Sequence, residues 1–299
     1  MNPLNIAIVQ FVKLLPKSIV HIFAKKYVAG EKLEDAVRVV KELNAKGIVA
    51  TMDVLGEAIK SKVEAAETKS QYFELLDTIQ KNKLNSNISI KPTALGLAID
   101  VDYCKELIIE IIEKAKSMDN FVRIDMEDSP FTQTTIDMFK ELREKYSNVG
   151  IVLQSYLRRT YDDVVDLNKI GSNYRLCKGI YIEPAEIAFK GRQEVRDNFM
   201  KSLARMFDDG NYVGIATHDE YLINESYKLI EEKKISKDKY EFQMLYGVTE
   251  HLRDRINADG HKIRIYVPYG EQWYAYSIRR LQENPSVAWY ITKSIFSFK

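Results

Sequence analysis

A short segment near the C-terminus carries residues that could hold an anion. It reads YAYSIRRLQENP, from Tyr274 to Pro285. In a helix, the spacing i, i+3, i+4 and i+7 places four of its side chains on one face: Tyr276, Arg279, Arg280 and Glu283. Two guanidinium groups can grip a carboxylate through charge-assisted hydrogen bonds. The same pattern is also typical of a solvated helix with weak Arg–Glu pairs, so the segment alone leaves both interpretations open.

Further polar side chains stand at or near the ends of short β-rich runs. The set is rich in cations and aromatic rings: Lys91, Asp125, Glu127, Gln154, Arg175, Lys178, Tyr181, Thr217, His218, Asp219, Gln243, Tyr246, Tyr266 and Tyr269. Lysine and aspartate within strand-like segments are costly to bury unless they are paired. We therefore expect a binding site that takes an anionic ligand with flat or apolar faces.

Eight β-rich runs, each followed by a longer helical pattern, must position these side chains. They are IVATMDV (48–54), ISIKPTA (88–94), FVRIDME (121–127), VGIVLQS (149–155), YRLCKGIY (174–181), VGIATHD (213–219), YEFQMLYG (240–247) and KIRIYVPYG (262–270). This alternation predicts parallel strands joined by crossover helices, and eight repeats predict a (β/α)8 barrel. An open doubly wound sheet is the alternative, but no glycine-rich turn follows the first run. In a barrel, all eight strand ends meet at one rim.

The helical segments complete the predicted organisation. Residues 1–47 precede the first strand and are expected to form two or three helices packed on the barrel, including one over 31–47. Within the barrel, 102–117 and 134–146 carry helical patterns. Residues 48–299 are expected to form the catalytic barrel, and the whole chain a single domain, because α/β barrels commonly reach this length.

Composition excludes several classes of function. The net charge of +1 provides no field to recruit nucleic acid. Two cysteines, Cys104 and Cys177, make no disulfide framework and suit a reducing cytosol. No metal is expected, because only His218 of the four histidines falls at a strand end. The apolar stretch within residues 1–16 is too short to span a bilayer. It predicts an amphipathic helix packed on the domain, with peripheral membrane contact as the alternative.

Seven segments lie along the predicted barrel: VRIDMEDS, VLQSYLRRT, YRLCKGIYIEP, GIATHD, EFQMLYG, RIYVPYG and YSIRRLQENP, and YVAGEKLEDA and DVLGE precede them. Together they resemble the proline dehydrogenases, and the combination of RLxKGxY with YxxRRLxEN is specific. The resemblance implies a distorted barrel of the monofunctional, FAD-dependent form. It implies oxidation of L-proline to Δ1-pyrroline-5-carboxylate, the first step of proline catabolism to glutamate. A hydride would pass from proline C5 to flavin N5, and electrons would pass on to a membrane quinone. The enzyme is expected in the cytoplasm, with a peripheral location at the inner face of the cell membrane as the alternative.

The resemblance implies a substrate site around the paired arginines. Arg279 and Arg280 would hold the proline carboxylate, and Glu283 would keep one arginine in place. Lys91 would pair with the carboxylate or with Glu283. The proline ring would pack against four side chains: Tyr181, Leu245, Tyr266 and Tyr276.

The resemblance also implies a set of flavin contacts. Arg175 would approach flavin N5 and stabilise the anionic reduced flavin, and Asp125 would orient this arginine and the lysine. Asp125 and Arg175 are thus the predicted catalytic residues. Gln154 would bond the pyrimidine edge. The other predicted cofactor contacts are the backbone of Met126 and the residues Lys178, Gly179, Ile180, Thr217 and His218.

The same residues are also compatible with other functions. A Schiff-base aldolase could use Lys91 or Lys178 as its nucleophile, and such a protein would be colourless. A non-catalytic barrel could bind an amino acid without any flavin. Another flavin barrel, such as a methylenetetrahydrofolate reductase, would lack the YxxRRLxEN match. The sequence supports orientation of a substrate better than acid–base catalysis, since no general base stands out.

Overall fold

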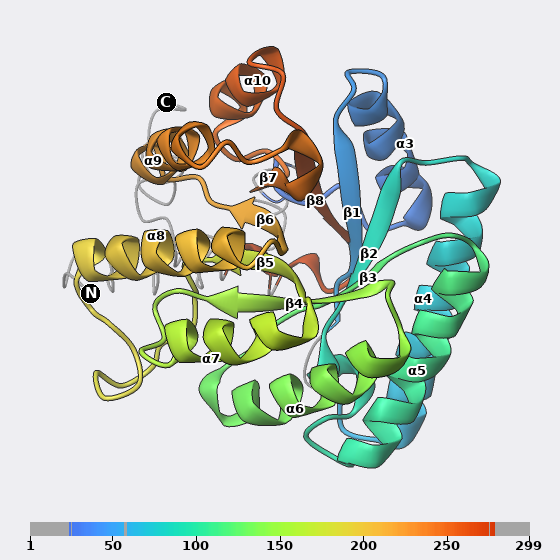
Figure 1. The fold of residues 1–299 in the computed structure, drawn as a ribbon. Helices are drawn as coiled ribbons and strands as arrows, with labels where there is room; N and C mark the ends of the chain where they lie inside the picture. The colour runs from blue at the N-terminus through green and yellow to red at the C-terminus, as the bar shows by residue number, and fades with distance from the viewer. Residues whose placement is uncertain (1–23, 25, 57–58, 275, 279–299) are drawn as a thin grey trace, which may run out of the picture.

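The computed structural model describes residues 24, 26–56, 59–274 and 276–278. Parallel strands, paired in chain order, close into a barrel that helices surround (Figure 1). The strands are β1 (Val49–Val54), β2 (Ser86–Ile90), β3 (Val122–Ile124), β4 (Val149–Gln154), β5 (Asn173–Cys177), β6 (Tyr212–Ala216), β7 (Tyr240–Leu245) and β8 (Ile263–Tyr269). The predicted (β/α)8 barrel is confirmed, and each predicted run overlaps one strand.

Helices alternate with these strands along the chain. They are α3 (Leu33–Asn44), α4 (Lys62–Lys81), α5 (Val101–Ser117), α6 (Ser129–Lys145), α7 (Thr160–Leu167), α8 (Arg192–Asp208), α9 (Glu220–Glu232) and α10 (Glu250–Ala258). Short 3-10 turns also occur: η1 (Pro92–Leu95), η2 (Asn168–Ile170) and η3 (Lys237–Lys239). The helix expected over 31–47 is α3, which packs against β1 and β8. The helices expected nearer the N-terminus fall within 1–23, outside the described residues.

Some predicted boundaries were wrong, each for a local reason. The run 88–94 ends as a strand at Ile90, because Pro92 opens the 3-10 turn η1 and has no N–H for a strand ladder. The helix predicted from residue 134 begins earlier, at Ser129. Its N-cap residue is Asp128 and proline occupies its first turn, two features that favour a helix start.

Strand residues alternate between an apolar outer face and a polar interior. Met52, Ile88, Ile124, Phe242 and Val267 are among the outward residues, and all belong to the main hydrophobic core. The alternate positions point into the barrel and are mostly polar: Thr51, Asp53, Asn87, Ser89, Arg123, Asn173, Arg175, Glu241, Gln243, Arg264 and Tyr266. Barrels of this class usually fill their interior with branched apolar side chains. Here charged groups occupy it, so they must pair with one another.

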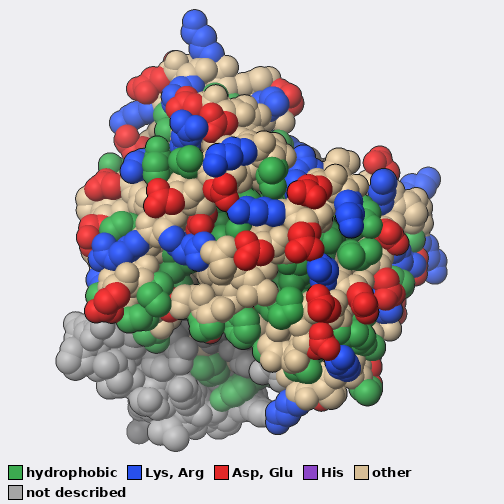
Figure 2. All heavy atoms as spheres, turned by 60° about the horizontal axis from the view of Figure 1, so that its bottom comes forward, with side chains coloured by type: hydrophobic (Ala, Val, Ile, Leu, Met, Phe, Trp, Pro, Cys, Tyr) green, Lys and Arg blue, Asp and Glu red, His purple; other side chains and the backbone are tan. Residues whose placement is uncertain are grey.

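The outer surface carries charges of both signs. Figure 2 shows lysine and arginine interspersed with aspartate and glutamate over the face it presents. That pattern agrees with the net charge of +1 and gives this face no field of a single sign. In the part of the chain that the structure describes, no helix combines the length and the apolarity that crossing a bilayer requires.

Candidate active site

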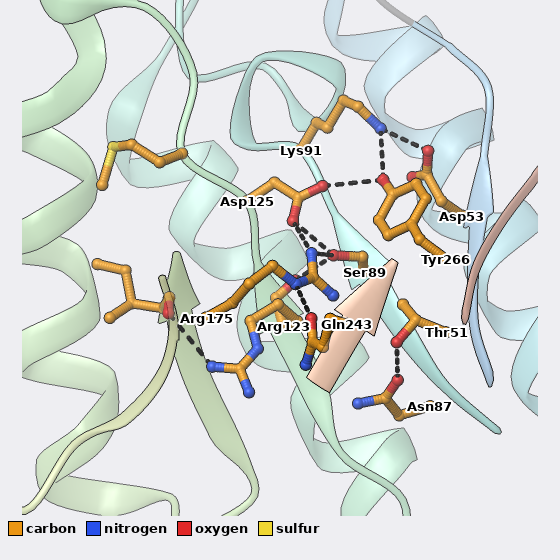
Figure 3. A network of polar contacts seen from close by, with 12 residues as sticks. Thr51, Asp53, Asn87, Ser89, Lys91, Arg123, Asp125, Arg175, Gln243 and Tyr266 are labelled. Atoms are coloured by element: carbon orange, nitrogen blue, oxygen red, sulfur yellow. Dashed lines mark hydrogen bonds and ion pairs between the residues drawn. The ribbon is translucent and has the colours of Figure 1, made fainter. Parts of the chain in front are cut away.

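The polar barrel interior forms two levels along the strands, and Figure 3 shows the upper level together with Arg123 and Asn87 of the lower one. We call Arg123, Glu241 and Arg264, with their partners Asn87 and Asn173, the lower layer. It lies toward the N-terminal ends of the strands. The upper layer lies nearer the C-terminal ends and consists of Asp53, Ser89, Lys91, Asp125, Arg175 and Tyr266.

Two buried ion pairs dominate the upper layer. Lys91 Nζ lies 2.6 Å from Asp53 Oδ2, and Arg175 Nη1 lies 2.8 Å from Asp125 Oδ1. The hydroxyl of Tyr266 joins the pairs, because it accepts from Lys91 Nζ at 3.4 Å and donates to Asp125 Oδ2 at 3.0 Å. Burial raises the pKa of the Asp53 carboxyl, although Lys91 beside it acts in the opposite direction. The predicted orientation by Asp125 is therefore direct for the arginine and indirect for the lysine.

The guanidinium of Arg175 is fixed on several sides. Its Nη1 also donates to Ser89 Oγ at 3.1 Å, and its Nε donates to Gln243 Oε1 at 2.6 Å. The ring of Tyr266 lies 5.2 Å from its central carbon, within the range of a cation–π contact. Burial raises the pKa of Tyr266 well above its usual value, so the phenol remains a hydrogen-bond donor. Arg175 thus presents a fixed positive charge.

The lower layer is paired as well. Glu241 accepts from Arg264 at 2.5 and 3.1 Å and lies 3.2 Å from Lys262 Nζ. Burial alone would raise the pKa of Glu241, but Arg264 outweighs it and the pKa falls to about 2. Arg123 donates to the backbone oxygen and to Oδ1 of Asn173. Burial and the neighbouring Arg175 charge lower the pKa of Arg123 to about 9.

A cavity of about 580 Å³ opens beside the upper layer. Every predicted site residue within the described residues lines it: Lys91, Asp125, Met126, Gln154, Arg175, Lys178, Gly179, Ile180, Tyr181, Thr217, His218, Leu245, Tyr266 and Tyr276. The three remaining predicted members, Arg279, Arg280 and Glu283, lie outside the described residues.

The cavity wall also includes residues that received no individual role from the sequence, of which only Glu127 and Gln243 were in the predicted set of strand-end side chains: Tyr27, Glu127, Val152, Cys177, Ala216, Gln243, Met244 and Val248. Asp53 and Ser89 were missed too, although a charge within the apolar run IVATMDV was a usable signal. Two tyrosines from the strand-end set do not line the cavity. Tyr269 belongs to the main hydrophobic core, and Tyr246 packs against it.

Glu127 is a buried carboxyl on the cavity wall. It accepts from the backbone N–H of Thr93 at 2.8 Å and from the Thr93 hydroxyl. Burial raises the pKa of Glu127 to about 7, an effect that the bonds from Thr93 and the charge of Lys91 only partly offset. This side chain therefore changes its charge near neutral pH.

The loop between β5 and α8 carries the predicted residues from Lys178 to Tyr181. Gly179 has a φ of +100°, and a Cβ there would lie 2.0 Å from the ring of Tyr156. Close packing within the protein therefore requires this glycine, whether or not a cofactor approaches it. Further along the loop, Glu183 accepts from Ser129 N at 2.7 Å and from Ser129 Oγ at 2.6 Å. The loop is thereby fastened to the first turn of α6.

Side chains that follow β5 and β6 form ion pairs and hydrogen bonds with each other and with α8. Asp219 accepts two bonds from Arg196, at 2.7 and 3.0 Å, and its carboxylate lies 3.6 Å from Lys178 Nζ. Burial opposes ionisation of Asp219, but Arg196 and Lys178 outweigh it and lower its pKa. His218 Nε2 accepts from the backbone N–H of Leu245 at 2.9 Å, which fixes the imidazole between β6 and β7.

One buried acceptor on the cavity wall is unsatisfied. Gln154 Nε2 donates to the backbone oxygen of Met126 at 3.1 Å. Its Oε1 is buried and has no hydrogen-bond partner among the described residues. Buried polar atoms nearly always have partners, so Oε1 is suited to accept from an N–H of a bound molecule.

A cation-containing, aromatic-lined cavity at the C-terminal end of a parallel barrel defines a (β/α)8 enzyme that acts on a small ligand. The chain belongs to the proline dehydrogenase family, whose profile matches residues 36–291. It is an oxidoreductase that acts on proline in proline catabolism. This membership overturns both the aldolase and the non-catalytic alternatives.

Individual relatives agree with this assignment. Proline dehydrogenase 2 of Bacillus subtilis (strain 168) is 39% identical over 265 residues, which cover 89% of this chain and 88% of the relative. Proline dehydrogenase of Deinococcus radiodurans is 35% identical over 277 residues, 91% of this chain and 89% of the relative. A solved structure of proline utilization A from Bdellovibrio bacteriovorus, inactivated by N-propargylglycine, superposes with a TM-score of 0.82 at 27% identity. That match covers 87% of this chain and 32% of the larger one.

Proposed function

We propose that this protein holds FAD in the cavity and oxidises L-proline to Δ1-pyrroline-5-carboxylate. When bound, FAD would supply the two-electron acceptor for the hydride of proline C5. The observation that carries the cofactor assignment is the buried, unpartnered Oε1 of Gln154. An acceptor in that position fits the N–H on the pyrimidine edge of an isoalloxazine ring.

Arg175 has the properties that electron transfer to such a ring requires. Its guanidinium keeps a fixed orientation through Asp125, Ser89 and Gln243. A preorganised cation in a site of low dielectric stabilises negative charge as it develops, without reorganisation at that moment. We assign Arg175 this role, and Asp125 the role of orienting it.

The remaining cofactor contacts are assigned from their places on the cavity wall and from the resemblance. Lys178 would pair with a phosphate, its ammonium already lying near the Asp219 carboxylate. The others would surround the ring and its ribityl chain: Met126, Gly179, Ile180, Thr217 and His218.

The substrate half of the site separates charge from apolar surface. Asp53 holds Lys91 in a buried ion pair, which favours the charged ammonium over a neutral Schiff-base nucleophile. Lys91, with Arg279 and Arg280 as assigned from the sequence, would hold the proline carboxylate, and Glu283 would support the arginines. The ring would pack against Tyr181, Leu245, Tyr266 and Tyr276. Such positioning supplies much of the rate enhancement when reacting atoms are held near each other.

The rest of the cycle is proposed from the resemblance. The proline amine must be neutral before hydride loss, and solvent at the barrel mouth would take its proton. Electrons would then leave for a membrane quinone. We place the enzyme in the cytoplasm, with peripheral contact at the inner face of the membrane and with residues 1–47 as a segment packed on the barrel.

Product formation tests the proposal. Purified protein supplied with FAD should reduce an artificial electron acceptor only when L-proline is present. It should also form Δ1-pyrroline-5-carboxylate, which o-aminobenzaldehyde traps as a yellow adduct. Glycine, which has no ring carbon corresponding to C5, is the matched negative substrate. Acceptor reduction without the adduct would contradict the proposed reaction.

A further inference from the structure

The barrel interior contains a glycine whose backbone does not require one. Gly214 lies in the middle of β6, paired with Arg175 on β5 and Glu241 on β7. It is not among the glycines with a positive φ. A Cβ at this position would nevertheless lie 2.3 Å from Gln243 Nε2 and 2.8 Å from Gln243 Cδ. The absence of a side chain at Gly214 therefore makes the room in which the Gln243 amide lies.

The Gln243 amide bridges the two layers of the interior. Its Oε1 accepts from Arg175 Nε at 2.6 Å, and its Nε2 donates to Glu241 Oε1 at 2.7 Å. The carboxylate can only accept and the guanidinium can only donate, so these neighbours fix which end of the amide faces which. Gln243 is 5% exposed, and solvent has little opportunity to compete for either bond.

Glu241 is a rigid anchor for this amide. Its carboxylate is 2% exposed and is held by two bonds from Arg264, with Lys262 as a second cation. A continuous chain of contacts therefore runs from Arg264 through Glu241 and Gln243 to Arg175. Asp125 and Ser89 hold Arg175 at Nη1, whereas Gln243 holds it at Nε. Two attachment points on different nitrogens define the plane of the guanidinium.

We propose that Gln243, placed in the space left by Gly214 and anchored by Glu241, is a positioning residue for Arg175. The inference rests on the proposed function, in which Arg175 stabilises the reduced flavin. Without Gln243 the guanidinium keeps its charge and its pair with Asp125 but loses its orientation. The stabilisation of the anionic reduced flavin then weakens, and the flavin potential falls.

The test is a double-mutant cycle on the FAD-loaded protein. Gln243→Met should lower the flavin midpoint potential, in the direction of Arg175→Ala but by less, and should lower kcat/KM for proline about tenfold. In the Arg175→Ala background the same substitution should leave both quantities nearly unchanged. Gln193→Met, the same chemical change at an exposed position on α8, is the control and should alter neither.

Gly214→Ala provides a second perturbation, which removes no hydrogen-bonding group from the protein. It should displace the Gln243 amide and lower the potential as Gln243→Met does. An equal shift from Gln243→Met with and without Arg175 would overturn the inference, and so would an unchanged potential in both Gln243→Met and Gly214→Ala. The proposed function would survive either result, provided that Arg175→Ala lowers the potential. A wild-type protein without flavin, or an Arg175→Ala variant with an unshifted potential, would overturn the role of Arg175 and this inference with it.

Discussion

The two layers of the barrel interior use the same residue types in different surroundings. In the lower layer the carboxylate of Glu241 is 2% exposed and is paired with Arg264, and none of the residues that define this layer lines the cavity. The upper layer borders a cavity of about 580 Å³. The hydroxyl of Tyr266 joins its two ion pairs by bonding to Lys91 and to Asp125. The difference indicates that the lower layer stabilises the barrel, whereas the upper layer is arranged for a ligand.

The largest effect should follow from breaking the lower layer. Glu241→Leu leaves the Arg264 guanidinium, whose side chain is only 11% exposed, without its carboxylate, so we expect a loss of about 3–5 kcal/mol in the free energy of unfolding. Chemical denaturation of the purified variant measures it. The control is Glu141→Leu, which removes an exposed pair with Lys105 and should cost at most about 1 kcal/mol. Equal losses in the two variants would mean that the lower layer has no special role in stability.

The next largest effect should be a dependence of the free energy of unfolding on pH, caused by the Glu127 carboxyl on the cavity wall. The pKa of Glu127 is raised to about 7 from an ordinary 4.5, so the folded state binds its proton more tightly than the unfolded state. The resulting stability is fully present below pH 4.5 and is lost as the pH rises through about 7. Its total is up to about 3 kcal/mol. The lowered pKa of Glu241 has the opposite sign, and its contribution disappears only as the pH falls toward about 2.

Urea unfolding of wild-type protein and Glu127→Gln at several pH values measures the contribution of Glu127 to stability. Relative to the variant, the wild-type protein should lose stability between about pH 4.5 and about pH 7, the two pKa values of the group. Glu186→Gln, an exposed position in the loop before α8, should keep the wild-type slope. If the free energy of unfolding changed with pH equally in wild-type protein and Glu127→Gln, this carboxyl would have an ordinary pKa.

A substitution in the upper layer should affect catalysis more than stability. Asp125→Asn removes the charge opposite Arg175 but keeps the size of the side chain, and water in the cavity can solvate what remains. Loss of a charge-assisted bond predicts a fall of about ten- to a hundredfold in kcat/KM for proline. Steady-state kinetics and denaturation should be measured together. A larger loss of stability than in Glu241→Leu would reverse the assignment of the two layers.

The smallest effect should come from the fastening of the loop between β5 and α8. The Glu183 carboxylate accepts from Ser129 N and Oγ in the first turn of α6, and Glu183→Ala removes both bonds. The free energy of unfolding should therefore fall by about as much as when an N-cap is lost, about 0.5–2 kcal/mol. Hydrogen exchange should rise in residues 178–183 and at the start of α6. Glu186→Ala is the matched control in the same loop. Unchanged exchange in Glu183→Ala would show that other contacts hold the loop.

The fold was predictable because its signal is local. Short β-rich runs that alternate with helical patterns mark the strands, and in several of them, as in Tyr240 to Leu245, apolar outer positions alternate with polar inner ones. The rim of a barrel then identifies which strand ends converge, and the described members of the predicted site all line the cavity. Asp53 and Ser89 were not predicted, since their roles depend on partners 38 and 36 residues away. Gln243 stood in the strand-end set but received no role, because its contact with Arg175 spans 68 residues and depends on barrel closure.

The proposed function requires the upper layer and its cavity to bring a flavin and proline together. The most direct measurement is the absorbance spectrum of the purified protein, before and after anaerobic addition of L-proline. We expect the two visible bands of an oxidised flavin, and these bands should fade when proline is added. A spectrum without these bands even after incubation with excess FAD, or bands that proline leaves unchanged, would contradict the proposed function.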